Sequence, residues 1–227
     1  MRRVICAGIA CMLLFATILP LQAARIVYSF AGGTEKPRIA LTFDDGPHPR
    51  YTPEILDILK EYGVSATFFS IGSNAENYPH LIERICAEGH ELGNHTHDHL
   101  HVAKLSREQL CADIESAQRV LEELGKSKIH LFRPPEGVCT EDLKNYCEQS
   151  GMTIVLWSVD TRDWAHTSVQ DIYVNVKSNV RDGSIILMHD FIGKNSPTPA
   201  ALRRILPMLQ ELGYEFVTVS TLLGEAE

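Results

Sequence analysis

The sequence predicts an α/β fold, a distorted (β/α) barrel with about seven parallel strands. Helical stretches repeatedly end in a glycine and are followed by a β-rich run, so helices and strands alternate along the chain. The strand runs are mostly continuous in apolar residues, as a parallel sheet covered on both faces requires. An open doubly wound sheet shows the same alternation. No G-x-G-x-x-G follows the first strand, however, so a dinucleotide site has no support.

Residues 1–24 are interpreted as a signal peptide or an N-terminal anchor. Arg2 and Arg3 precede an uncharged apolar run over 4–19, and small residues follow it. The run is short for a membrane span. We therefore expect an exported protein, either secreted or associated with the cell wall or membrane through an uncleaved N-terminal segment. Residues 25–37 are expected to be a lead-in and 38–227 the only globular domain.

Seven β-rich runs are the expected strands, at 39–43, 67–71, 91–94, 129–132, 153–158, 184–188 and 215–219. Glycines that close the intervening helices in the left-handed conformation are expected at Gly63, Gly89, Gly125, Gly151, Gly183 and Gly213.

The helix starts are marked as well. Thr52 is expected to cap a helix with Pro53 at its first position, and Ser106 forms a capping box with Gln109. Thr140 precedes two acidic residues, which favour a helix N-terminus.

Composition limits the class of protein. Hydrophobic residues make up 44% of the 227 residues and the formal net charge is −8, so the chain is neither disordered nor a nucleic-acid binder. No obligate protein partner is indicated, and we expect a monomer. The even number of cysteines outside the first segment permits a disulfide, but free buried thiols are the favoured interpretation for Cys86, Cys111, Cys139 and Cys147.

Ionisable residues follow the expected strands at their carboxyl ends, where a β/α barrel builds its site. The segments are DDGP from Asp44, HTHDH from His95, RPPEG from Arg133, DTRDW from Asp160 and HD from His189. His95 and His99 have the i, i+4 spacing that brings two imidazoles to one metal, although a solvated polar loop has the same composition. Of two adjacent aspartates leaving a strand, one can bind the metal while the other takes a proton from water. Such a sequence is also common in plain turns.

Five segments in this order resemble the polysaccharide deacetylases with a NodB-homology domain, the fourth carbohydrate-esterase family. The resemblance covers residues 39–223, and its motifs are TFDDGP from Thr42, HTHDH from His95, RPPEG from Arg133, DTRDW from Asp160 and ILMH from Ile186. It implies one divalent metal ion, commonly zinc, with cobalt or another transition metal as the alternative.

The resemblance also implies roles for single residues. The metal ligands would be Asp45, His95 and His99. Asp44 would be the general base, held by Arg133, and His189 the general acid, tuned by Asp163. The substrate would be contacted by Pro135, Glu136, Trp164, Ile186 and Leu187, with the last two forming an apolar slot for the acetyl methyl group.

Glu136 departs from the family pattern, which has tyrosine at this position with its backbone N–H serving the oxyanion. Glutamate keeps that N–H but changes the surface offered to substrate.

The resemblance implies a metal-dependent hydrolase that removes N-acetyl groups from an extracellular amino sugar polymer. Peptidoglycan is the first expected substrate and chitin-type oligomers the second, and the single domain also resembles spore-associated members. The alternatives are a catalytically inactive glycan-binding relative and a deacylase of a small amide or O-acetyl ester.

Overall fold

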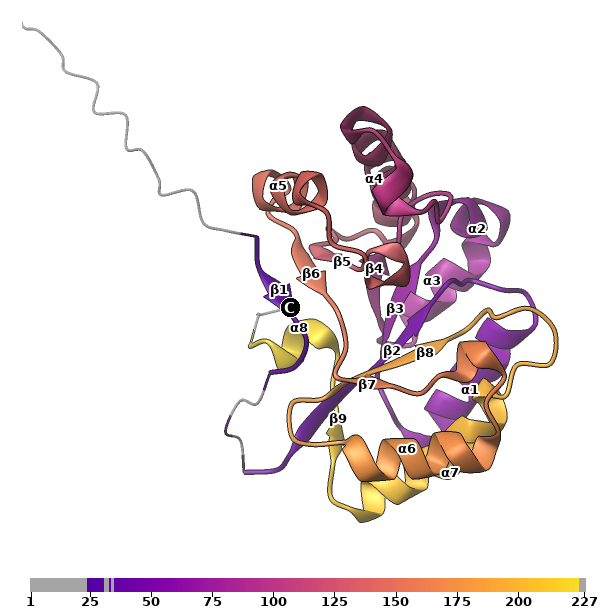
Figure 1. Ribbon diagram of the computed structural model, residues 1–227. Helices are drawn as coiled ribbons and strands as arrows, with labels where there is room; N and C mark the ends of the chain where they lie inside the picture. Colours follow the sequence, from indigo (N-terminus) through magenta and orange to yellow (C-terminus); the bar gives the residue numbers. More distant parts are fainter. Residues whose placement is uncertain (1–23, 31–32, 34, 225–227) are drawn as a thin grey trace, which may run out of the picture.

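The computed structural model describes residues 24–30, 33 and 35–224, which form a parallel sheet curved into an incomplete barrel with helices around it (Figure 1). Eight strands lie side by side in the order β1-β6-β5-β4-β3-β2-β8-β7, and β9 pairs with the beginning of β2. All pairs of strands are parallel. The predicted (β/α) barrel is confirmed. The barrel is distorted because it does not close: in the described part of the chain, β1 and β7 are the two edge strands and do not pair with each other.

The strands are β1 Ile26–Val27, β2 Arg38–Asp44, β3 Thr67–Ser70, β4 Glu91–Asn94, β5 Leu131–Phe132, β6 Thr153–Val155, β7 Val159–Asp160, β8 Ile185–His189 and β9 Glu215–Phe216. The helices are α1 Tyr51–Tyr62, α2 Gly72–Asn77, α3 Pro79–Ala87, α4 Arg107–Gly125, α5 Glu141–Ser150, α6 Val169–Asn179, α7 Thr198–Glu211 and α8 Val219–Leu222. Single 3₁₀ turns occupy Val102–Lys104, Pro135–Gly137 and Asp163–Ala165.

Two short strands differ from the expectation. β1 lies in the segment taken as a lead-in and pairs with β6, and β7 is separate from the strand expected over 153–158. Neither strand directly follows a helix, so both lack the helix end that marks most of the other strands in the sequence. The expected signal peptide or anchor lies almost wholly in residues 1–23, outside the described part, and export therefore stays a prediction. Among the described residues, no helix is both long and apolar enough to cross a membrane.

The helix ends follow most of the predicted signals. The capping box of Ser106 with Gln109 is present, and Thr140 caps α5. Thr52 does not cap α1, because the Thr52 hydroxyl forms hydrogen bonds with His48 and Asp190. The helix begins one residue earlier, at Tyr51, and has no side-chain cap. Gly125 was expected to take the left-handed conformation, but it is the last residue of α4 and Lys126 takes it instead.

Side chains alternate between the two faces of the curved sheet. On β2, Ile39, Leu41 and Phe43 pack outward against the helices in the larger hydrophobic cluster. Ala40 belongs to the inner cluster, which includes residues of α8 such as Val219. By the same alternation Asp44 points inward at the carboxyl end of β2. The sheet therefore places its chemistry inside the barrel, above an apolar floor.

The described cysteines, Cys86, Cys111, Cys139 and Cys147, are free thiols. The structure thus pairs none of these four in a disulfide, as the favoured interpretation expects, and only Cys147 of the four is fully buried.

Candidate active site

A cavity of about 540 Å³ opens at the carboxyl ends of the strands. Its walls combine carboxylates and imidazoles with a few apolar side chains. The lining residues are Asp44, Asp45, His95, His99, Glu136, Trp157, Asp160, Trp164, Leu187 and His189. The expectation that the strand ends build the site is met, because the lining comes from the ends of β2, β4, β5, β6, β7 and β8 and the loops after them.

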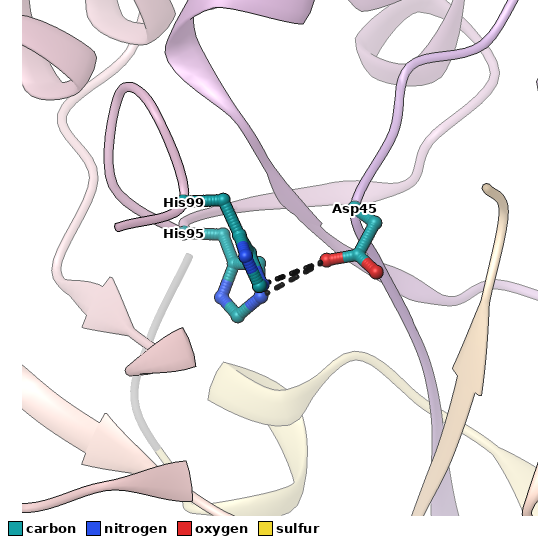
Figure 2. Close-up of side chains that lie close together, drawn as sticks. All are labelled: Asp45, His95 and His99. Atoms are coloured by element: carbon teal, nitrogen blue, oxygen red, sulfur yellow. Dashed lines mark ion pairs between the residues drawn. The ribbon is translucent and has the colours of Figure 1, made fainter. Parts of the chain in front are cut away.

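Asp45, His95 and His99 converge on one point (Figure 2). Asp45 Oδ1 lies 3.3 Å from His95 Nε2 and 3.2 Å from His99 Nε2. This oxygen is buried, yet neither contact has hydrogen-bond geometry. Three ligand atoms within 4.8 Å of one another that face a common centre are the arrangement of a metal site with open positions. The predicted ligand set therefore fits a divalent cation.

The imidazole of His95 is fixed from behind. Its Nδ1 lies 2.7 Å from the carbonyl oxygen of Arg133, and since a carbonyl can only accept, Nδ1 carries the proton. The other ring nitrogen, Nε2, is thereby directed toward Asp45. Orientation of a ligand histidine by a backbone carbonyl is a common second contact at metal sites.

The loop that delivers His99 depends on two residues in the left-handed region, Thr96 at φ 66° and His99 at φ 52°. Asn94 Oδ1 accepts the Thr96 N–H, and Thr96 Oγ1 accepts the His99 N–H. These bonds wind the loop into a compact turn, which brings the second imidazole beside the first with ring centroids 5.0 Å apart.

The charges in this group support each other. Burial alone would raise the pKa of Asp45, but the neighbouring imidazoles of His95 and His99 lower it below its usual range. The contact with Asp45 raises the pKa of His99. Asp45 is therefore a carboxylate over the whole neutral range, as a ligand must be.

Asp44 lies beside this group and is held by Arg133. Arg133 Nη1 donates to Asp44 Oδ1 at 2.7 Å and to the Thr42 hydroxyl at 2.8 Å. The rest of the guanidinium donates to the carbonyls of Val155 and Leu156 and lies 4.0 Å above the Phe69 ring centroid. Arg133 is fully buried, and among the described residues Asp44 is the one carboxylate paired with it, so one oxygen of Asp44 is fixed and the other faces the cavity.

The turn after Asp45 is braced by the buried carboxyl of Asp190. A Cβ on Gly46 would lie 1.9 Å from Asp190 Oδ2, so glycine is required there. Asp190 Oδ2 accepts from the Thr52 hydroxyl, whose oxygen accepts the His48 N–H at 2.8 Å. These hydrogen bonds occupy the Thr52 hydroxyl, which was expected to cap α1. They also support the turn in which Asp45 has a φ of 77°.

His189 ends β8 with its Nδ1 2.8 Å from Asp163 Oδ1. Asp163 is fully buried and also accepts the backbone N–H groups of His189 and Trp164 and the hydroxyl of Thr198. Burial alone would lower the pKa of His189, but the hydrogen bond and charge of Asp163 raise it to about 9. His189 is thus a protonated group facing the cavity at neutral pH.

The expected substrate-contacting residues divide into two groups. Glu136, Trp164 and Leu187 line the cavity, whereas Pro135 is buried and is not among its walls. The expectation that Ile186 contacts substrate is wrong. Its side chain points outward into the core under the helices, because neighbouring residues on β8 face opposite sides of the sheet. Of the pair, only Leu187 can contribute to an apolar slot.

Sequence reasoning missed Trp157 and gave no role to Asp160, both of which line the cavity. Trp157 falls in a run that looked like one continuous strand, and the break between β6 and β7 turns its ring toward the site. An aromatic residue near the end of a strand was the available signal.

Comparisons with known proteins agree on one family. A family model described as polysaccharide deacetylase matches residues 31–155. A peptidoglycan-N-acetylglucosamine deacetylase from Bacillus cereus is 45% identical over 187 residues, covering 82% of this chain and 87% of that protein. A chitooligosaccharide deacetylase from Azorhizobium caulinodans is 38% identical over 205 residues, covering 85% of this chain and 95% of that one. The crystal structure of the Bc1960 peptidoglycan N-acetylglucosamine deacetylase matches with a TM-score of 0.83 and 38% identity, covering 88% of this chain and 94% of that one.

Proposed function

Because the chain belongs to the polysaccharide deacetylase family, we propose that it is a metal-dependent hydrolase that removes N-acetyl groups from an extracellular amino sugar polymer. Peptidoglycan is the first proposed substrate and chitin-type oligomers the second, after the names of the two relatives. The observation that carries the proposal is the meeting, in one cavity, of a ligand triad, a buried carboxylate and a protonated histidine.

The amide bond needs help at both ends, because its carbonyl is a poor electrophile and its amine a poor leaving group. A divalent cation held by Asp45, His95 and His99 would act as a Lewis acid on the carbonyl and make water more acidic. Asp44 has one oxygen fixed by Arg133 and the other toward the cavity, so it is placed to take a proton from attacking water.

His189 is the proposed general acid. Its Nδ1 is engaged with Asp163, which leaves Nε2 to donate a proton to the departing nitrogen. The C–N bond then breaks to give acetate and a free amine. The backbone N–H of Glu136 is the proposed oxyanion donor, and Leu187 the apolar contact for the methyl group.

Zinc is the proposed resident ion, since two imidazoles and a carboxylate are a common catalytic zinc set, and cobalt is the alternative. Export through the N-terminal segment is proposed from its sequence alone.

The direct test is acetate release by metal-loaded protein from peptidoglycan, from N-acetylglucosamine oligomers, and from a small aryl acetate and acetamide. We expect acetate from at least one of the two polymers and its loss after chelation, with recovery on adding zinc. Turnover of the small ester alone would replace the proposal with a small-molecule deacylase. Binding to glycan without acetate from any substrate would favour the inactive glycan-binding alternative, against which stands the presence of all seven expected catalytic and metal-ligand residues.

The pH dependence of turnover tests the pairing of His189 with Asp163. A general acid must be protonated, so activity should fall as pH rises through about 9, the raised pKa of His189. Asp163→Asn removes the charge that raises this pKa, so the alkaline limb of kcat should move to lower pH, toward the ordinary histidine value near about 6.5. The measurement is kcat against pH for both proteins. An alkaline limb unmoved by the substitution would contradict the role of His189.

A further inference from the structure

The cavity contains more negative charge than the proposed chemistry uses. Among its described lining residues there are four carboxylates and three imidazoles but no lysine or arginine. Asp44 is matched by Arg133 and Asp45 by two imidazoles. Two carboxylates, Glu136 and Asp160, have no part in the proposed reaction.

In the part of the chain that the structure describes, neither of these two side chains forms an ion pair with a lysine or an arginine. Glu136 Oε2 lies 3.6 Å from His101 Nε2, and its side chain is 60% exposed. Asp160 Oδ1 accepts the backbone N–H of Arg162 at 2.8 Å, a bond that leaves the carboxylate charge in place. Both carboxylates can therefore meet a cation that enters the cavity.

The two residues stand on different sides of the site. Glu136 follows β5 and Asp160 ends β7, and four strands, β4, β3, β2 and β8, separate these two in the sheet. The ligand triad and His189 come from the strands between them or the loops that follow. An oligomer that places its acetylated unit over the triad would extend its neighbouring units toward these carboxylates.

We propose that Glu136, assisted by Asp160, selects amino sugar oligomers that carry a protonated free amine on a unit next to the acetylated one. The inference rests on the proposed function, whose own product is such an amine. Removal of one acetyl group would thereby improve the oligomer as a substrate for the next removal. A neighbouring unit with a free carboxylate would be disfavoured by the same charges.

The test compares two trimers of equal length in one competition assay: fully acetylated, and with one unit as free glucosamine. Work at about pH 6.5 keeps the amine protonated. We expect the protein to favour the amine-bearing trimer at low salt, and Glu136→Gln to reduce that preference by up to about fivefold, the size of an exposed charge pair. The loss should lie in KM and should diminish in high salt. Glu141→Gln is the matched control, since Glu141 is an 81% exposed glutamate outside the cavity, and it should keep the full preference.

A binding measurement separates this inference from the proposed function. The trimer of free glucosamine has no acetyl group to lose, so its Kd can be measured without turnover, and the difference in Kd between variants reports the Glu136 charge. We expect the Kd to rise by up to about fivefold in Glu136→Gln and to stay constant in Glu141→Gln. Equal Kd values for the unsubstituted protein and Glu136→Gln would overturn the inference even if acetate is released. Absence of acetate from every substrate, with the Kd changed as expected, would overturn only the proposed reaction.

Discussion

Asp44→Asn should lower kcat by about 10²- to 10⁴-fold while leaving the divalent ion bound, because an amide cannot accept a proton from water. The substitution keeps the shape of the side chain, and asparagine Oδ1 can still accept the hydrogen bond that Arg133 Nη1 gives to Asp44. The neighbouring ligand group should therefore keep its geometry, and circular dichroism verifies the fold, because the substitution leaves the buried Arg133 charge unmatched. The measurements are kcat for acetate release and metal content by elemental analysis.

Asp45→Asn is the matched control, as the adjacent residue with the same chemical change. It weakens one of the three ligands, so metal content should fall together with activity. An active Asp44→Asn protein, or one that loses its metal while Asp45→Asn retains it, would mean that the two aspartates have exchanged roles.

His95→Ala should remove most of the bound metal and, with it, activity. His95 is the most buried of the three ligands and is fixed through Nδ1 by a carbonyl, so its Nε2 is the best positioned of the set. Asp45 and His99 alone would hold an ion weakly, since stable sites of this kind use three protein ligands. The measurement is metal stoichiometry after dialysis, with circular dichroism to verify the fold.

His97→Ala offers a control within the same loop. Its imidazole is outside the ligand triad, and its Nε2 lies 3.8 Å from Glu76 Oε2. Metal stoichiometry should stay at one per chain in this variant. Full occupancy in His95→Ala, or loss in His97→Ala alone, would refute the ligand assignment.

Much of the fold was predictable because its signals are local. Continuous apolar runs and the residues that end helices locate most strands, and a parallel barrel then gathers their carboxyl ends. That rule brings Asp44, His95 and His189 together without any knowledge of contacts. β1 and β7 were missed because neither directly follows a helix, so no helix end marks their start, and their pairing with β6 and β8 is what defines them.

The finer geometry of the site depends on backbone conformations that could not be predicted from the sequence. Asp45, Thr96, His99 and Glu136 all have positive φ, which residues other than glycine rarely adopt. Each is held there by surrounding hydrogen bonds or packing. The misplacement of Ile186 has a different origin. Two adjacent apolar residues look equivalent in sequence, and only the register of β8 on β2 decides that Leu187 faces the cavity.

Arg133 serves the site with two chemically distinct parts, a side chain on Asp44 and a main-chain carbonyl on His95. The carbonyl survives any substitution that preserves the loop, whereas the guanidinium does not. A homologue with another residue in place of this arginine would still orient the histidine equivalent to His95 and still bind metal. The aspartate equivalent to Asp44 would lose its hydrogen bond to the guanidinium. Metal content in such a homologue reports an intact loop and says nothing about turnover. Under the proposed mechanism, sorting members of the family into active and inactive by metal uptake would therefore count inactive proteins as enzymes, and the identity of this one buried side chain would be the better criterion.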